Sequence, residues 1–192
     1  MIAVRTLNIL ICVHNMRIIL SNHYAGSPFH GMEYRPYYLA REWVRLGHKV
    51  TIVAATHAHT RQVVPQAGRE VIDGVVYRWL PSPAYAGNGA RRVLNMVSFV
   101  SLLHKATPEI LSEEKPDVVI ASSTYPSDIY PCRALARRCR ARLVWEVHDL
   151  WPLSPVELGG MSRWHPFIMA MQHGEDYACR HADFVVSMLP EA

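Results

Sequence analysis

Short apolar runs alternate with amphipathic segments along this chain. The runs at residues 16–20, 50–55, 117–121, 142–147 and 183–187 have the length and continuous apolar character of buried β-strands. Between the first two runs, a polar loop at 22–31 leads into a segment, 33–46, with apolar side chains at intervals of three and four. That segment predicts a helix burying Leu39, Ala40, Trp43 and Leu46. The alternation predicts an α/β fold: a Rossmann-like, doubly wound, mainly parallel sheet with helices on both faces.

The segment at 91–105 is the least ordinary of the predicted helices. Its polar residues Asn95, Ser98 and Ser101 form one narrow strip, and most other positions are apolar. Such a helix is either buried in the core or partly sunk in a membrane surface, where Arg91 and Arg92 would meet lipid headgroups. Elsewhere, Asp73-Gly74 between two β-like runs predicts a hairpin.

Composition narrows the function classes. The 192 residues suffice for one ample domain, and the net charge of +4 suits an anionic ligand or membrane surface. The basic residues are scattered without a nucleic-acid-binding motif, so nucleic acid is not an expected partner. The four cysteines contain no C-x-x-C pair and the histidines have no metal-ligand spacing, so no metal site is expected. No stretch reaches the about 20 apolar residues of a membrane span, and no signal peptide is evident, which favours the cytoplasm.

Candidate chemistry lies in the loops that follow the predicted strands, because ligands of such sheets bind at the carboxyl ends of strands. In the first loop, Gly31 would let a ligand approach the backbone, and His30 precedes it. The start of the following helix could hold an anion. The loop has no G-x-G-x-x-G fingerprint, and no Lys-Ser or Lys-Thr follows its glycines. These absences argue against a dinucleotide-binding dehydrogenase and a P-loop NTPase.

Two later loops carry further candidates. His148 and Asp149 follow the run at 142–147: the histidine can exchange protons near neutral pH, and the aspartate could orient its ring or bind sugar hydroxyls. Trp151 could form a stacking wall or lie in the core. Ser123 and Thr124 belong to a hydroxyl-rich loop after the run at 117–121, which suits a hydroxylated or phosphorylated ligand or is a solvated turn.

Taken together, these residues resemble the N-terminal half of bacterial GT-B glycosyltransferases, nearest to retaining family 4 in the branch that builds O-antigen, capsule and colanic-acid-like polysaccharides. The likeness covers about residues 16–190. It rests on residues 16–20, Gly31, Glu33, the Arg-Pro-Tyr-Tyr-Leu-Ala-Arg-Glu segment at 35–42, residues 45–51, 98–99 and 116–120, Asp-Leu-Trp-Pro at 149–152, and Glu-Leu-Gly at 157–159.

The resemblance implies a function. Residues 16–192 would be the acceptor-binding domain of an enzyme that transfers a sugar from a nucleotide-sugar, without metal or other cofactor, to a lipid-linked saccharide. His148 would lie near the transferred sugar and Gly31 near phosphates, with Glu33 and Arg35 among the substrate-binding residues. The family usually has two adjacent glycines where this chain has His30-Gly31.

The domain organisation follows from the same resemblance. Residues 1–15 are expected to be an N-terminal extension or an extra strand, and the C-terminal donor-binding domain is expected to be absent. The chain alone would then be inactive, and a separate subunit could supply the donor site. It could be a peripheral protein at the inner face of the cytoplasmic membrane. The alternative is a non-catalytic half that recruits a two-subunit transferase to the membrane.

Overall fold

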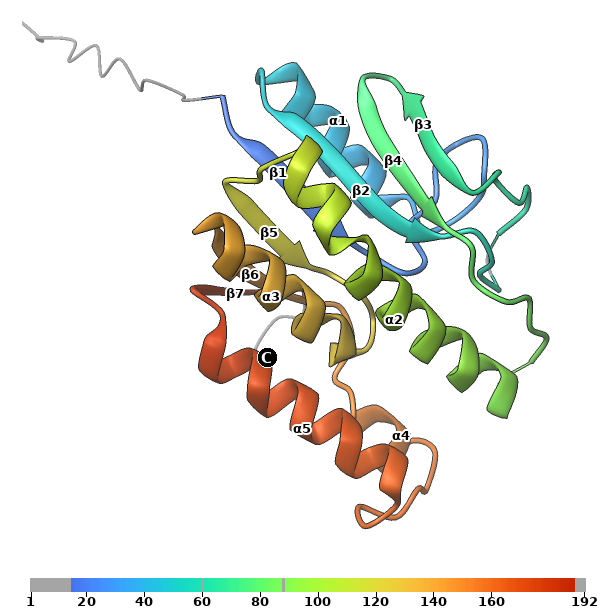
Figure 1. The fold of residues 1–192 in the computed structure, drawn as a ribbon. Helices are drawn as coiled ribbons and strands as arrows, with labels where there is room; N and C mark the ends of the chain where they lie inside the picture. Colours follow the sequence, from blue (N-terminus) through green and yellow to red (C-terminus); the bar gives the residue numbers. More distant parts are fainter. Residues whose placement is uncertain (1–14, 60, 88, 189–192) are drawn as a thin grey trace, which may run out of the picture.

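The fold is built on one seven-stranded sheet. The computed structural model describes residues 15–59, 61–87 and 89–188, and the strand order is β3-β4-β2-β1-β5-β6-β7 (Figure 1). Only β3 is antiparallel to its neighbour. The predicted extension at 1–15 lies almost wholly outside the described residues. The strands are β1 Arg17–Ser21, β2 Lys49–Ala55, β3 Gly68–Ile72, β4 Val75–Leu80, β5 Val118–Ala121, β6 Arg142–Val147 and β7 Phe184–Ser187.

Helices cover both faces of the sheet. Figure 1 shows α1 behind the sheet and α2, α3 and α5 in front of it. Ile18 and Leu20 of β1 pack in the cluster that contains Tyr37 of α1, whereas Ile19 packs in the cluster that contains Phe99 of α2. This alternation along a strand buried on both sides confirms the predicted doubly wound fold. The helices are α1 Arg35–Arg45, α2 Ala90–Glu113, the 3₁₀ turn η1 Pro126–Asp128, α3 Ile129–Cys139, α4 Leu153–Glu157 and α5 Pro166–His181.

The first helix buries only part of the predicted stripe: Ala40 is buried and Trp43 packs partly buried against the same cluster. Its fully buried residues are Pro36, Tyr37 and Ala40. Leu46 was expected in the core, but it is 64% exposed because α1 ends at Arg45 and Leu46 is already its C-cap. The hairpin prediction is confirmed: β3 and β4 pair through Asp73-Gly74, with φ angles of 49° and 81° that suit a tight hairpin turn.

The helix α2 is longer than predicted, and its polar strip runs from the buried Asn95 through the partly buried Ser98 to the exposed Ser101. Asn95 is 0% exposed, and its Nδ2 donates a hydrogen bond to the Pro83 carbonyl at 2.6 Å. The exposed side of the first turns instead carries Leu94 (61% exposed) and Val97 (59%). Core packing therefore accounts for one side of α2 and leaves an apolar strip on the other. Across the part of the chain described here, no helix has both the length and the apolar character needed to cross a bilayer.

Candidate functional site

The sheet changes winding direction between its two central strands. After β1 the chain leads to α1 on one face, and after β5 it leads to α3 on the opposite face. In sheets of this kind, loops that depart in opposite directions leave a crevice at the carboxyl edge, which is where ligands bind. Asn22 and Ser122 close the floor of this crevice, because the Asn22 Nδ2 donates to the Ser122 carbonyl at 2.6 Å. The backbone N–H of His23 donates to Ser123 Oγ at 3.1 Å.

A buried carboxylate organises the adjoining part of the edge. Glu146, the second-last residue of β6, has a side chain only 7% exposed. Its Oε1 accepts hydrogen bonds from Nε and an Nη of Arg35, at 3.2 and 2.6 Å. Its Oε2 accepts from Ser122 Oγ at 2.7 Å and lies 3.2 Å from His148 Nε2. Helix α1, strand β6 and the loops after β5 and β6 therefore meet at one side chain.

The charge of Glu146 is well compensated. Burial by itself would raise the pKa of this carboxyl, but hydrogen bonds from His148, Ser122 and Arg35 lower the pKa to about 2. Glu146 is therefore an acceptor at neutral pH. Its contacts also explain why a carboxylate is tolerated at the end of an otherwise apolar strand.

The same contacts fix the state of the His148 ring. The Ser122 hydroxyl donates its one proton to Glu146. The Ser122 oxygen must therefore accept the hydrogen bond from His148 Nε2, which lies 2.8 Å away. The Nε2 atom therefore carries a proton. Among the described residues no hydrogen bond occupies Nδ1, which in the neutral ring is a proton acceptor. The site thus holds a histidine with a defined tautomer.

The first loop folds back on itself through its glycines. Gly31 has φ of 96° and forms β-bridges with Ser27 and Arg61. A Cβ on Gly26 would lie 1.8 Å from the Gly31 carbonyl oxygen, so only glycine fits there. The sequence shows a glycine at position 26, but only the folded loop shows that it allows the backbone to approach Gly31 closely.

The structure separates His30 from His148. The His30 ring bonds Ser27 Oγ at 2.8 Å and lies 5.0 Å from the Trp79 ring, over the β3–β4 hairpin. Burial lowers the pKa of His30. Glu33 is held by its backbone, which accepts from the Gly26 N–H at 2.8 Å, and it is only partly buried. Of the predicted residues around the first loop, Arg35 is the one whose side chain reaches the Glu146 network.

The remaining predicted site residues differ in whether they are accessible to a ligand. Ser123 Oγ donates to Asp128 at 2.7 Å, so this hydroxyl serves the protein interior. Thr124 is partly exposed and Asp149 is exposed, so both are accessible from the edge. Trp151 packs edge-on against Phe167, with 5.8 Å between ring centroids, as part of a hydrophobic cluster.

The two arginines at the start of α2 point in different directions. Arg91 is exposed. The Arg92 guanidinium lies over the Tyr24 ring at 5.8 Å, and so faces the loop after β1. Only Arg91 therefore has the outward position expected of a headgroup contact.

Sequence reasoning missed Glu146, Ser122 and Asp128. A lone carboxylate at the end of a buried apolar strand is the signal that could have identified Glu146. Asp128 is 0% exposed and accepts from Ser21 Oγ at 3.1 Å and from Ser123. Burial raises the pKa of Asp128 to about 6 against these hydrogen bonds. Within the described residues, no group of three or more His, Cys, Asp or Glu side chains is arranged to hold a metal ion.

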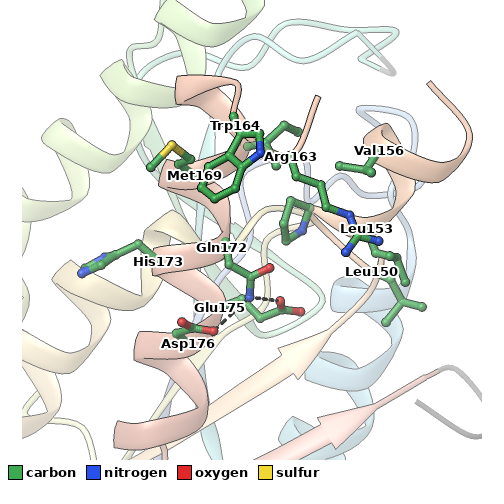
Figure 2. A pocket seen from close by; sticks show the side chains of 12 residues that line it. Leu150, Leu153, Val156, Arg163, Trp164, Met169, Gln172, His173, Glu175 and Asp176 are labelled. Atoms are coloured by element: carbon green, nitrogen blue, oxygen red, sulfur yellow. Dashed lines mark hydrogen bonds between the residues drawn. The ribbon is translucent and has the colours of Figure 1, made fainter. Parts of the chain in front are cut away.

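Beside the Asp149 loop lies a hollow of about 650 Å³, which we call the α4–α5 hollow. Figure 2 shows Leu150 and Leu153 on one wall and Trp164 and Met169 on the other. Gln172 lies in its floor and donates to Glu175 and Asp176, both at 2.9 Å. The hollow combines apolar walls with an acidic floor.

The chain is similar to several solved structures, and the first of these supports the fold. Sucrose-phosphate synthase from Thermosynechococcus elongatus aligns with 90% of this chain and 47% of its own length, at 11% identity and a TM-score of 0.56. MurG from Acinetobacter baumannii aligns with 91% of this chain and 41% of its own length, at 12% identity and a TM-score of 0.44. The C-terminal domain of a hydrogenase from Pyrococcus furiosus aligns with 67% of this chain and 88% of its own length, at 17% identity and a TM-score of 0.47. The chain thus spans about half the length of the synthase.

Comparison with sequences gives one clear result. No curated protein sequence matches the chain. A family model described as a glycosyl transferase 4-like domain matches residues 30–192, which include α1, the whole Glu146 network and both faces of the sheet. The chain therefore belongs to the family of glycosyl transferase 4-like domains, with the Rossmann-like fold of GT-B glycosyltransferases.

Proposed function

We propose that this chain is the acceptor-binding domain of a retaining glycosyltransferase of the O-antigen, capsule and colanic-acid branch. The enzyme would move a sugar from a nucleotide-sugar to a lipid-linked saccharide in cell-surface polysaccharide synthesis. The observation that carries this proposal is the buried network at the carboxyl edge. There Arg35, Ser122 and Glu146 hold His148 in one tautomer beside the crevice between β1 and β5.

Three groups near the carboxyl edge support a role in acceptor recognition, although the His148 side chain is only 7% exposed. His148 offers Nδ1 as an acceptor for a sugar hydroxyl, and the exposed carboxylate of Asp149 can accept further hydroxyl hydrogen bonds. Thr124 lies at the same edge. Positioning and electrostatic stabilisation of the departing diphosphate would account for most of the rate enhancement. His30, Gly31 and Glu33, in the loop after β1, would contribute to substrate binding from the side of the β3–β4 hairpin.

The donor site is proposed to belong to a second domain outside these residues, in the same enzyme or in a separate subunit. Polar groups in the crevice support this division. Asn22 donates to the Ser122 carbonyl, the Ser122 hydroxyl to Glu146 and the Ser123 hydroxyl to Asp128. These groups therefore do not form an open cradle for a diphosphate. The isolated chain would accordingly be inactive as a transferase.

The apolar strip of α2 supports a peripheral position at the inner face of the cytoplasmic membrane. Leu94 and Val97 are more than half exposed, and the exposed Arg91 precedes them. This strip also favours the second candidate function, a non-catalytic half that brings a partner transferase to the membrane. Catalytic and scaffolding roles differ in whether His148 is needed for transfer.

The test is sugar transfer by the chain combined with the polypeptide encoded directly downstream of it. Radiolabelled UDP-, GDP- and dTDP-sugars are supplied with bacterial membrane lipids, and label is counted in the lipid extract. His148→Ala is expected to lower turnover about 100-fold, the size of a lost general acid–base or positioning group. His173→Ala, on the exposed side of α5, is the matched control. Transfer that survives His148→Ala would favour the scaffolding role, and no transfer from any donor would refute the catalytic one.

A further inference from the structure

A second cavity lies on the other side of α5 from the α4–α5 hollow. It has a volume of about 670 Å³ and is formed by three elements, α2, α5 and the start of α3 with its preceding turn. We call it the α2–α5 groove, and its apolar walls include Val97, Val100, Tyr125, Pro131, Phe167 and Met171. The size falls within the roughly 300–1,000 Å³ range of small-molecule sites.

The charges around the groove have one sign. None of the described residues that line it is Asp or Glu, and His104 and Lys105 lie at one end. At the other end, the exposed Arg91 lies two residues before Val93, the first lining residue of α2, whereas Arg92 faces Tyr24. The α4–α5 hollow differs, because Glu175 and Asp176 form its floor (Figure 2). An apolar groove flanked by cations is complementary to a hydrocarbon chain with an anionic head.

The walls of the groove are in contact with the loops at the proposed acceptor site. Phe167, at the start of α5, packs against Trp151 in the loop that follows His148 and Asp149. Tyr125 forms part of the wall, and its hydroxyl bonds the His23 Nδ1 at 2.6 Å in the loop after β1. Both contacts place one end of the groove at the carboxyl edge of the sheet.

We propose that the α2–α5 groove binds the hydrocarbon tail of a single lipid phosphate, with the phosphate at the end next to the exposed Arg91. The proposal rests on the proposed function, because it makes this lipid the carrier of the acceptor saccharide. It commits to one lipid molecule in the groove rather than to the surface of a bilayer. The hydrocarbon tail of the lipid would run along α2 from Val93 toward Lys105.

Methionine methyl groups give a direct readout. Met96 and Met171 line the groove, whereas Met169 lines the α4–α5 hollow on the same helix. The chain is labelled at its methionine methyl carbons, and dodecyl phosphate is added below its micelle concentration. Chemical shifts of Met96 and Met171 are expected to move saturably, whereas the Met169 shift stays constant. Dodecyl maltoside should bind more weakly, and inorganic phosphate should leave all three unchanged.

Two substitutions on α5 separate the cavities. Ala170 is exposed and lines the groove, so Ala170→Trp should fill it and weaken dodecyl phosphate binding about tenfold or more. Gln172→Trp is the matched control, because Gln172 is equally exposed but lines the α4–α5 hollow. Circular dichroism confirms that both variants fold.

Three outcomes would overturn the proposal. One is a change in the Met169 chemical shift that Gln172→Trp abolishes, which would place the hydrocarbon tail of the lipid in the α4–α5 hollow. Another is a response of Met96 and Met171 to anionic phospholipid vesicles but not to monomeric dodecyl phosphate, which would make the groove a bilayer contact. The third is equal affinity for dodecyl phosphate and dodecyl maltoside. None of these measurements involves sugar transfer, so the groove and the proposed function fail separately.

Discussion

At the scale of single residues, two buried carboxylates behave in opposite ways. Glu146 has three hydrogen-bonding partners, one of them cationic, and its pKa falls to about 2 despite burial. Asp128 has only neutral partners, its Oδ1 has no hydrogen-bond partner among the described residues, and burial raises its pKa to about 6. The two groups therefore contribute to stability with opposite dependence on pH.

Glu146→Gln is expected to destabilise the fold at pH 7 by about 1–3 kcal/mol, because the new amide would direct a donor at Arg35 or Ser122. The pKa of Glu146 lies below its ordinary value of 4.5, so the carboxylate stabilises the fold above pH 4.5. Its contribution is lost as the pH falls toward 2, and the gap between the two proteins should narrow. Urea unfolding measures it. Glu157→Gln, at an exposed ion pair with Arg163, should change stability by no more than about 0.5 kcal/mol.

Asp128→Asn should show the reverse trend. The folded-state pKa of about 6 lies above the ordinary 3.8, so the contribution of Asp128 is complete below pH 3.8 and lost as the pH rises through 6. Relative to the native protein, Asp128→Asn is expected to gain about 1–3 kcal/mol between pH 4 and pH 7.5. Urea unfolding at both pH values measures the gain. A difference that is constant across this range would contradict the assignment.

At the scale of elements, the first loop and α2 are the segments that the proposals depend on. The first loop is held by backbone contacts, including the Gly26 N–H to the Glu33 carbonyl at 2.8 Å and the Gly31 bridges. Helix α2 divides its surface between the core, through Phe99 and Leu103, and an exposed apolar strip. One element is thus fixed by backbone geometry and the other by the distribution of its side chains.

Gly26→Ala should cost more than about 3 kcal/mol, because its Cβ would collide with the backbone at Gly31 and not with a movable side chain. Gly89→Ala is the control: a Cβ there meets nothing within 4 Å, and loss of a glycine N-cap costs about 1 kcal/mol or less. Thermal unfolding of both variants measures the difference. Similar losses would show that the loop can rearrange.

The double variant Leu94→Ser, Val97→Ser should keep its stability within about 1 kcal/mol, because both side chains are exposed. It should lose retention on vesicles that contain anionic lipid, as measured by co-sedimentation. Phe99→Ala, on the buried side of α2, should instead lose about 3–5 kcal/mol of stability. If the native chain itself is not retained by such vesicles, α2 has no membrane role.

The elements were largely predictable from sequence, because each depends on a local pattern. Buried strands appear as apolar runs, and Asp73-Gly74 has the left-handed backbone that its hairpin requires. The prediction for Leu46 was wrong, because the helix ends one residue earlier, at Arg45. The pattern also left open whether Asn95 is buried. It is buried, and the Pro83 carbonyl that accepts its hydrogen bond could not be identified by spacing along the chain.

At the scale of the whole molecule, the sheet topology determines which loops meet. The crevice lies between β1 and β5, so residues about 100 positions apart, such as Asn22 and Ser122, form its floor. Sequence reasoning located His148 and Arg35 separately but could not pair them. Their link is Glu146, and the contact between Arg35 and Glu146 spans 111 residues. The fold was therefore easier to predict than the site.

The proposed division of labour makes a prediction for the isolated chain. Titration with UDP-, GDP- and dTDP-sugars is expected to show no saturable binding up to about 1 mM, which corresponds to about −4 kcal/mol. The reason is that the crevice hydroxyls and amide are committed to internal hydrogen bonds. Calorimetry measures this directly. Micromolar affinity for any of these donors would indicate a complete nucleotide site within the chain.

The ion pair between Arg35 and Glu146 is unequal in its access to water. The Arg35 side chain is 40% exposed, whereas that of Glu146 is 7% exposed and also bonded by Ser122 and His148. Dissolved ions screen an exposed charge far more than a buried one. Raising the ionic strength therefore weakens the contact of Arg35 first and leaves the contacts among Glu146, Ser122 and His148 in place. The arginine can thus leave the network without disrupting those buried hydrogen bonds.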